Sequence, residues 1–387
     1  MNPGDFETGP CDVSSLAAPG VRSLHPYLPG KPISELEREY GVSNIIKLAS
    51  NENPLGASPA ALEAMRSELE ELALYPDGGG FELKKALSGF HDIEMTRITL
   101  GNGSNDVLVL AAEAFLQPGL EAVYSQYSFA VYPIAVEAVG ATARVAAARP
   151  ESDPQALGHD LEAMKALVGH ETRLVFIANP NNPTGGWLEA EELHGFLSVM
   201  PNHVLTVVDE AYFEYSRPLG LPDASQWLDE FPGLIVTRTF SKAYGLAGIR
   251  IGYCLSSPAI ADMLNRIRQP FNVNSLALAG AKAALADRGF IDRSVDMNTR
   301  GLEQLGCGLQ DLGIPVCPSA GNFVLANFGR PVGGIYEALL HAGVIVRPVA
   351  NYGLENHLRI TIGSKTQNES LLSALSQILE GGRGQGA

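Results

Sequence analysis

The chain has 387 residues, which suggests about two domains, and its apolar and charged fractions of 45% and 18% are ordinary for a globular protein. Its net charge of −16 at pH 7 disfavours attraction to nucleic acid and to anionic membranes. No uncharged apolar run is long enough to cross a bilayer, and the polar N-terminus lacks the apolar segment of a signal peptide.

Between about residues 33 and 240, short apolar runs alternate with amphipathic helical periods. We expect strands at residues 45–48, 97–100, 122–124, 174–178, 204–208 and 234–239. We expect helices at residues 33–40, 59–72, 81–89, 106–115, 129–139 and 190–200. This alternation predicts βαβ units and a mainly parallel sheet, with strands buried on both faces.

After about residue 270 the pattern changes. Two long helices are expected at 275–286 and 293–312, strands at 323–327, 344–347 and 357–362, and a final helix at 369–379. This order predicts a second, smaller α+β domain. We therefore expect an N-terminal arm at 1–50, a large domain at 51–272 and a small domain at 273–387.

The cysteines give no sign of a metal site or a disulfide framework. Cys11, Cys254, Cys307 and Cys317 form no CxxC pair, and no histidine lies beside them at metal-ligand spacing. We expect reduced thiols in a cytoplasmic protein without a bound metal.

A lysine follows the apolar strand at 234–239. The strand runs into Ser241 and Lys242, and Arg250 follows closely. A lysine just beyond a strand end lies where α/β sheets bind ligands, and lysine amines form Schiff bases when a buried, cationic environment lowers their pKa. Arg250 could supply that cation and bind a phosphate through two hydrogen bonds. A Ser-Lys pair alone is a weak signal, because most lysines are simply solvated.

Asp209 closes the buried strand at 204–208. A bare carboxylate there is costly unless it has a partner, and the N–H of a protonated pyridine ring is a suitable one. The Asp209-Glu210 pair is also typical of a Walker B or metal-binding carboxylate, or of a purely structural residue. The chain has no GxxxxGK(S/T) loop, which weakens the nucleotide alternative.

Two loops after strands could also bind a ligand. The segment 179–185, with two prolines, predicts a rigid turn that could hold an asparagine amide against a ligand hydroxyl. The segment 100–106 has two glycines before a helix that begins at Ser104 or Asn105, and the free N–H groups of such a helix start bind anions. A plain turn and a capped helix are the simpler interpretations.

Two arginines lie in apolar strands of the C-terminal part, at Arg347 and Arg359. An arginine in such a strand needs an anionic partner. That partner is either a carboxylate of the protein or an anionic substrate.

The order of these segments resembles that of the fold-type I pyridoxal-phosphate (PLP)-dependent aminotransferases and, among them, the histidinol-phosphate aminotransferases. The resemblance runs from about residue 24 to 363. The segments that carry it are His25-Pro26-Tyr27, Leu48 to Pro54, Tyr75 to Gly78, Asn179 to Gly185, Asp209 to Tyr212, and Ser241-Lys242 with Arg250. It implies an α/β fold with a mainly parallel seven-stranded sheet in the large domain.

The resemblance also implies how the cofactor is held. Lys242 matches the Schiff-base lysine and the proton-transfer group, Asp209 the partner of the pyridine nitrogen, and Tyr212 with Asn182 the pair that bonds the phenolic oxygen. The remaining cofactor contacts implied are Ser104, Asn105, Ser241 and Arg250 at the phosphate, Thr239 beside them, Phe129 stacked on the ring, and Tyr75. The family often has tyrosine where this chain has Phe129. Tyr75 matches a residue that reaches the neighbouring subunit's site, which implies a homodimer.

For the substrate, the resemblance implies that Arg359 binds the α-carboxylate. Tyr27 and Arg347 match residues that hold the phosphate of histidinol phosphate, and Asn53 belongs to the same substrate-binding set. The implied reaction moves an amino group between L-glutamate and 2-oxoglutarate on one side and histidinol phosphate and its ketone on the other.

Three alternatives remain open. An aromatic amino-acid aminotransferase would share the same scaffold, because specificity depends on a few pocket residues. A PLP-dependent decarboxylase of a phosphorylated amino acid would share it too. A binding protein that has lost catalysis is disfavoured by the intact Lys242, Asp209 and Arg359.

Overall fold

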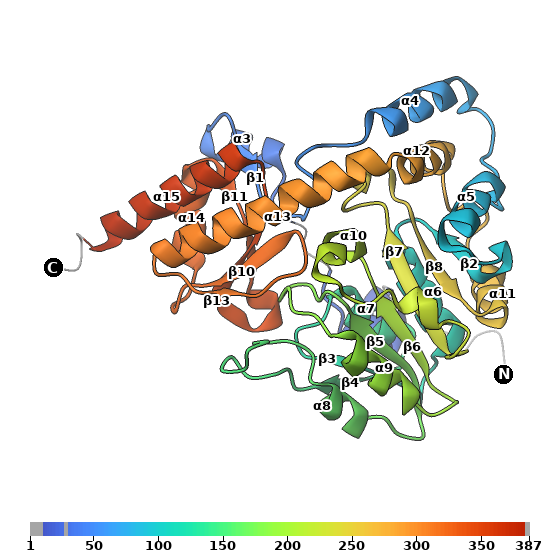
Figure 1. The fold of residues 1–387 in the computed structure, drawn as a ribbon. Coiled ribbons are helices and arrows are strands. Elements are labelled where there is room, and N and C mark those ends of the chain that lie inside the picture. The colour runs from blue at the N-terminus through green and yellow to red at the C-terminus, as the bar shows by residue number, and fades with distance from the viewer. Residues whose placement is uncertain (1–10, 27–29, 384–387) are drawn as a thin grey trace.

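The computed structural model describes residues 11–26 and 30–383. Its centre is a seven-stranded sheet in the order β2-β8-β7-β6-β5-β3-β4 (Figure 1). All neighbouring strands are parallel except at β8, which runs antiparallel to β2 and β7. The strands are β2 (Ile98–Gly101), β3 (Glu121–Ser125), β4 (Thr142–Ala146), β5 (Thr172–Ala178), β6 (Leu205–Asp209), β7 (Leu234–Thr239) and β8 (Gly252–Ser256).

Helices cover both faces of this sheet. On one face, residues of α6, α7 and α11 pack on Leu174, Phe176 and Val207. On the other, residues of α4, α5, α9, α12 and the start of α13 pack against the alternate positions Val175 and Val208. The helices of this part are α4 (Pro59–Glu68), α5 (Phe81–His91), α6 (Ser104–Phe115), α7 (Val131–Ala138), α8 (Leu161–Ala166), α9 (Ala190–Ser198), α10 (Phe213–Ser216), α11 (Pro258–Ile267) and α12 (Ser275–Ala286).

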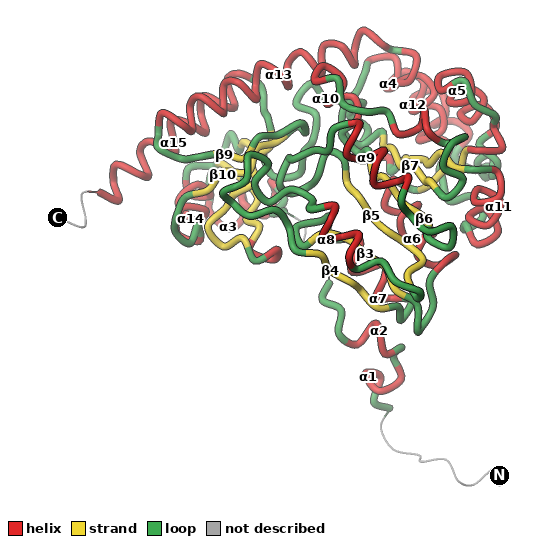
Figure 2. Tube along the Cα trace, turned by 60° about the horizontal axis from the view of Figure 1, so that its bottom comes forward, coloured by secondary structure: helices red, strands yellow, loops and turns green. Residues whose placement is uncertain are grey.

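A second core lies in the C-terminal part, around the antiparallel sheet β12-β13-β10-β9. Its strands are β9 (Val316–Cys317), β10 (Phe323–Asn327), β12 (Arg347–Val349) and β13 (Leu354–Thr361). Its helices are α13 (Arg288–Asp311), α14 (Gly333–His341) and α15 (Lys365–Arg383). The long helix α13 extends from this part to the large sheet, as the tube view shows (Figure 2).

The N-terminal segment joins this second core. Helix α3 (Ile33–Tyr40) packs on α14, and β1 (Ile46–Lys47) pairs in parallel with β11 (Val344–Ile345). Leu48 is buried in the C-terminal core. Two short helices, α1 (Val13–Leu16) and α2 (Pro19–Arg22), precede these elements and lie near α7 (Figure 2).

The expected mainly parallel sheet of seven strands is confirmed. Individual elements differ from the expectation. The elements that were not expected include the exposed edge strand β4, the strands β8 and β9, and the helices α8, α11 and α14. Helix α7 begins at Val131 rather than 129, because the Tyr132 N–H bonds the Phe129 carbonyl in a turn before the helix. Helix α13 begins at Arg288, earlier than the expected residue 293. Within the described ranges, no helix has both the length and the apolar character needed to cross a membrane.

Candidate active site

A cavity of about 300 Å³ opens at the carboxyl ends of β5, β6 and β7, where parallel sheets bind ligands. Residues 49–52, just after β1, form one wall, and Arg347 and Arg359 enter from the C-terminal part. The site therefore lies between the two cores. The lining residues are Gly30, Ala49, Ser50, Asn51, Glu52, Ser104, Asn105, Phe129, Ala178, Pro180, Asn182, Asp209, Ala211, Tyr212, Thr239, Ser241, Lys242, Ala247, Arg250, Arg347 and Arg359.

Lys242 lies in the turn after β7, with its side chain in the cavity. Its Nζ donates to the Ser50 carbonyl at 3.3 Å and lies 5.8 Å from the centre of the Tyr212 ring. Burial lowers the pKa of Lys242 to about 8, and the positive charge of Arg359 adds to that effect. A neutral amine, the form that attacks a carbonyl, is therefore accessible near neutral pH.

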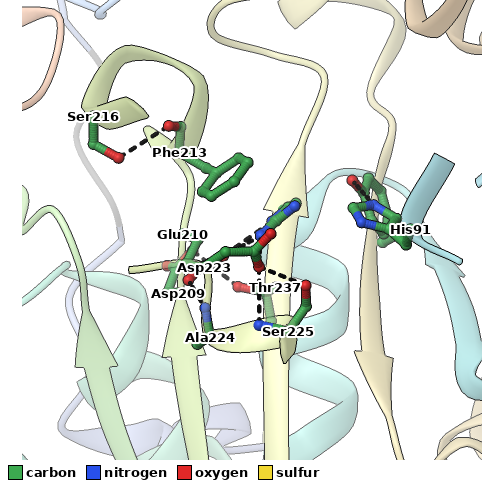
Figure 3. A network of polar contacts seen from close by, with 11 residues as sticks. His91, Asp209, Glu210, Phe213, Ser216, Asp223, Ala224, Ser225 and Thr237 are labelled. Carbon is green, nitrogen blue, oxygen red and sulfur yellow. Dashed lines mark hydrogen bonds and ion pairs between the residues drawn. The ribbon is translucent and has the colours of Figure 1, made fainter. Parts of the chain in front are cut away.

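Asp209 ends β6 and is only 4% exposed. Its Oδ2 accepts from the Tyr132 hydroxyl at 3.0 Å. Its Oδ1 accepts from the Thr237 hydroxyl at 2.9 Å (Figure 3). Burial raises the pKa of Asp209, while the bonds from Thr237 and Tyr132 and the charge of Lys242 oppose that rise. The cavity thus has a hydrogen-bonded acid at its base.

Tyr212 and Asn182 both line the cavity, and each is hydrogen-bonded to a residue from outside the large sheet. The Asn51 amide donates to the Tyr212 hydroxyl at 2.8 Å. Arg359 donates to Asn182 Oδ1 at 2.6 Å and to the Ala49 carbonyl at 2.7 Å. Asn182 follows β5 in a loop with two cis X-Pro bonds, at Pro180 and Pro183. Arg359 therefore lies in the same hydrogen-bonded wall as the groups expected at the cofactor.

The start of α6 forms a corner of the cavity that is suited to an anion. The helix begins at Ser104, as expected, and Ser104 and Asn105 line the cavity at its N-terminus, where backbone N–H groups favour anions. Arg250 donates to the Ser241 hydroxyl at 3.2 Å and so stands at the same corner.

Two glycines keep this corner tightly packed. A Cβ on Gly252 would lie 2.3 Å from the Ser104 nitrogen, and one on Gly103, where φ is +87°, would lie 2.3 Å from Arg250 Nη2. Only glycine permits this close approach of β8 and Arg250 to the helix start.

Arg347 and Arg359 occupy directly opposed positions of the antiparallel pair β12–β13. Both side chains line the cavity, with Lys242 and Arg250 making four cations. Asp209 and Glu52 are the carboxylates among the described lining residues, and Glu52 is paired with Lys47 at 2.7 Å. The cavity therefore favours anions, although the whole chain is acidic.

Most of the predicted site residues meet in this cavity. Those lining it are Ser104, Asn105, Phe129, Asn182, Asp209, Tyr212, Thr239, Ser241, Lys242, Arg250, Arg347 and Arg359. Two lie elsewhere in this chain. Asn53 does not line the cavity and its amide bonds the Ala243 carbonyl and the Ser294 hydroxyl. Tyr75 is 82% exposed and stacks on Phe271 at 4.7 Å. Tyr27 lies outside the described residues.

Four contributors were not singled out from the sequence, namely Asn51, Glu52, Tyr132 and Thr237. Asn51 and Glu52 belong to the quoted segment Leu48 to Pro54, and that segment could have marked them. Tyr132 and Thr237 carry no such signal, because a buried tyrosine or threonine in an apolar segment is ordinary. Only the tertiary contacts reveal their bonds to Asp209.

The two-core fold and the site together define a fold-type I transferase, with a lysine after a central strand and an acid at the end of its neighbour. The sequence profile of the aminotransferases of class I and II matches residues 43–375. These enzymes are PLP-dependent.

Similar proteins narrow the class. The chain is 57% identical over 367 residues to histidinol-phosphate aminotransferase 2 of Methylococcus capsulatus, covering 95% of this chain and 99% of that one. It is 56% identical to the protein of the same name from Pseudomonas fluorescens Pf-5, and the match covers 95% of this chain and 98% of that one. The crystal structure of histidinol-phosphate aminotransferase from Sinorhizobium meliloti in complex with pyridoxal-5'-phosphate superposes with a TM-score of 0.85 at 30% identity, covering 94% and 97%. The chain belongs to the histidinol-phosphate aminotransferase family.

The residues present fit PLP. The corner at Ser104, with Ser241 and Arg250, suits a phosphate, and Gly103 and Gly252 let β8 and Arg250 approach the helix start closely. The buried Asp209 suits a protonated ring nitrogen, and the amine of Lys242 suits the aldehyde.

Proposed function

We propose that this protein transfers an amino group between L-glutamate and imidazole acetol phosphate, giving 2-oxoglutarate and L-histidinol phosphate in histidine biosynthesis. The observation that carries the proposal is the opposed pair Arg347 and Arg359, which lines the same cavity as Lys242. The names of relatives more than 50% identical over nearly their full length support the same substrate.

Two anionic groups on the substrates correspond to the two arginines. Arg359, fixed by Asn182 and the Ala49 carbonyl, is positioned for the α-carboxylate of glutamate. Arg347 is the proposed partner of the phosphate of histidinol phosphate, and Tyr27 is proposed to assist it. Asn53 keeps a proposed role near the substrate through the loop it holds, since its amide bonds fix the turn before α4 to Ala243 and Ser294.

The protein's own groups move the protons. When bound, PLP supplies an electron sink for the substrate Cα. The Lys242 amine takes the Cα proton as general base and returns it as general acid. With PLP bound, Asp209 would hold a proton on the ring nitrogen, Tyr212 and Asn182 would hold the phenolic oxygen, and Phe129 would cover the ring. Two half-reactions on one site predict ping-pong kinetics.

We propose further that the protein is a cytoplasmic homodimer. The exposed Tyr75–Phe271 pair, next to the exposed Leu72 and Leu74, is an apolar surface suited to a partner subunit, which Tyr75 would reach. The described cysteines are free thiols, as expected in a reducing compartment.

The test compares kcat/KM for histidinol phosphate and phenylalanine with 2-oxoglutarate as acceptor. We expect a clear preference for histidinol phosphate. The variant Arg347→Ala should lower kcat/KM for histidinol phosphate by roughly 10- to 100-fold and leave the glutamate half-reaction nearly unchanged, because a charge-assisted bond to the phosphate is lost. Arg359→Ala is the reciprocal variant and should lower kcat/KM for glutamate more than for histidinol phosphate, because histidinol phosphate has no carboxylate.

A preference for phenylalanine would reject the proposed substrate in favour of an aromatic amino-acid aminotransferase. Equal losses for both substrates in Arg347→Ala would remove the proposed phosphate contact. Carbon dioxide release from a phosphorylated amino acid would indicate the decarboxylase alternative.

A further inference from the structure

Two hydroxyl groups from different elements converge on one buried carboxylate. Tyr132, in the first turn of α7, donates to Asp209 Oδ2 at 3.0 Å, and Thr237, in the middle of β7, donates to Oδ1 at 2.9 Å. Both donors are fully buried and Asp209 is 4% exposed. Each carboxylate oxygen thus has a fixed donor before any ligand is considered.

Neither hydroxyl is needed for packing. Tyr132 stacks on Phe176 at 4.8 Å and 16°, and a phenylalanine ring would do the same. Thr237 follows the apolar run Leu234 to Val236 of β7, where a valine would fill the same space. Polar atoms at such positions cost free energy unless they are bonded, and here both are bonded to Asp209.

We propose that Tyr132 and Thr237 are positioning residues that hold Asp209 ionised and in a single orientation toward the cofactor's ring nitrogen. The proposal rests on the proposed role of Asp209 as partner of that nitrogen. The two residues touch only Asp209 among the proposed reacting groups and act through it.

The physical basis is the competition between burial and hydrogen bonding. Burial disfavours the charged carboxylate, whereas donors to that form favour it. The other groups that face Asp209 are the Ala211 backbone N–H and Lys242, which also favour the carboxylate, and the neutral Tyr212. A carboxylate stabilised by two donors is a weaker base, so the proton between Asp209 and the ring nitrogen stays on the nitrogen.

Tyr132 also contacts Phe129, the residue proposed to cover the ring of the cofactor. Its backbone N–H donates to the Phe129 carbonyl at 3.0 Å, and the two rings meet edge to face at 6.0 Å. One turn of chain therefore places both the cavity-lining ring of Phe129 and the donor to Asp209.

The experiment compares the binding of PLP with that of its 1-deaza analogue, which lacks the ring nitrogen. The variants are Tyr132→Phe and Thr237→Val, which remove one hydroxyl each. Tyr124→Phe is the matched control, because this buried tyrosine lies 6.3 Å from Tyr132, ring centre to ring centre, without a bond to Asp209. Thr237→Ser restores a hydroxyl.

We expect each test variant to bind PLP roughly tenfold more weakly, as for the loss of one bond to a charged group, and to bind the deaza analogue as the wild type does. The ring-nitrogen signal of 15N-labelled PLP should move toward the unprotonated position in both variants. Tyr124→Phe should leave affinity and signal unchanged, and Thr237→Ser should recover them.

Equal weakening for both ligands would mean a purely structural role and would overturn the proposal, as would an unchanged 15N signal in both variants. If the wild type itself binds the two ligands equally, the proposed role of Asp209 fails. If the wild type prefers PLP to the deaza analogue and both variants keep the same preference, only the proposed role of Tyr132 and Thr237 fails.

Discussion

At the scale of single residues, Lys242 is the group whose chemistry depends most on its surroundings. Burial and the nearby charge of Arg359 both disfavour its cationic form, and only Glu52 and Asp209 act in the opposite direction. Arg359, the proposed partner of the substrate carboxylate, therefore also favours the neutral amine of Lys242. A lysine on the exposed surface would be almost fully protonated near neutral pH.

The pKa of about 8 for Lys242 predicts how the apoprotein captures PLP. Because the neutral amine reacts, the rate of capture should rise with pH through about 8 and level off above it, rather than near the usual 10.5. The rate is measured from the growth of visible absorbance after mixing.

Arg359→Leu supplies the comparison for this rate. Removal of the Arg359 cation should raise the pH at which the capture rate is half-maximal, because a positive charge that disfavours protonation of Lys242 is lost. A wild-type midpoint near the ordinary lysine value would contradict this account of Lys242.

At the scale of elements, β6 and β7 carry different chemistry on the two faces of the sheet. Asp209 and Thr237 are paired in register and meet on the cavity side. The next residue of each strand turns to the opposite side, where Arg238 bonds Glu210 at 2.7 and 3.0 Å and Asp223 at 2.5 Å (Figure 3). This second cluster fixes the strand ends that carry the site.

Arg238→Met should destabilise the protein by about 3–5 kcal/mol, because it leaves Glu210 uncompensated in the core. Arg238 is 1% exposed and also lies on the Phe213 ring, 3.5 Å from its centre. Urea denaturation of the PLP-bound protein measures the change.

Arg266→Met is the control for this variant. Its pair with Asp262 on α11 is solvent-exposed and should contribute less than about 1 kcal/mol. Similar losses in the two variants would show that the buried cluster has no special role in stability.

Much of the fold and site follows from local patterns, and the remainder depends on tertiary contacts. The β5, β6 and β7 runs are apolar and their ends are polar, so both the strands and the positions of Asn182, Asp209 and Lys242 could be predicted. Strand β4 is mostly exposed at the edge of the sheet and contains no apolar run. Tyr132 lies 77 residues from Asp209 in the chain, and no sequence period connects them.

At the scale of the whole molecule, the exposed face around Tyr75 bears on the proposed homodimer. A tyrosine that is 82% exposed beside a half-exposed Phe271 is unusual in a monomer, and both lie away from their own cavity. A symmetric dimer would place such a residue against the site of the other subunit.

Mixing two defective variants tests this arrangement. Lys242→Ala removes the amine, and Tyr75→Ala removes the proposed contact with the partner. In a mixed dimer one site has both defects and the other has neither, so mixing after dissociation should restore roughly a quarter of wild-type activity. Activity that merely averages the two variants would show that each site is complete within one subunit.

The pairing of β1 with β11 has a consequence for the order in which the protein can be built. Ile46 and Lys47 emerge from the ribosome early, but their partners Val344 and Ile345 follow about 300 residues later. At typical rates of translation the first strand waits roughly 15 to 60 seconds for the second. The wall at residues 49–52 forms only when nearly the whole chain exists, so a nascent chain that stops short has no finished cavity.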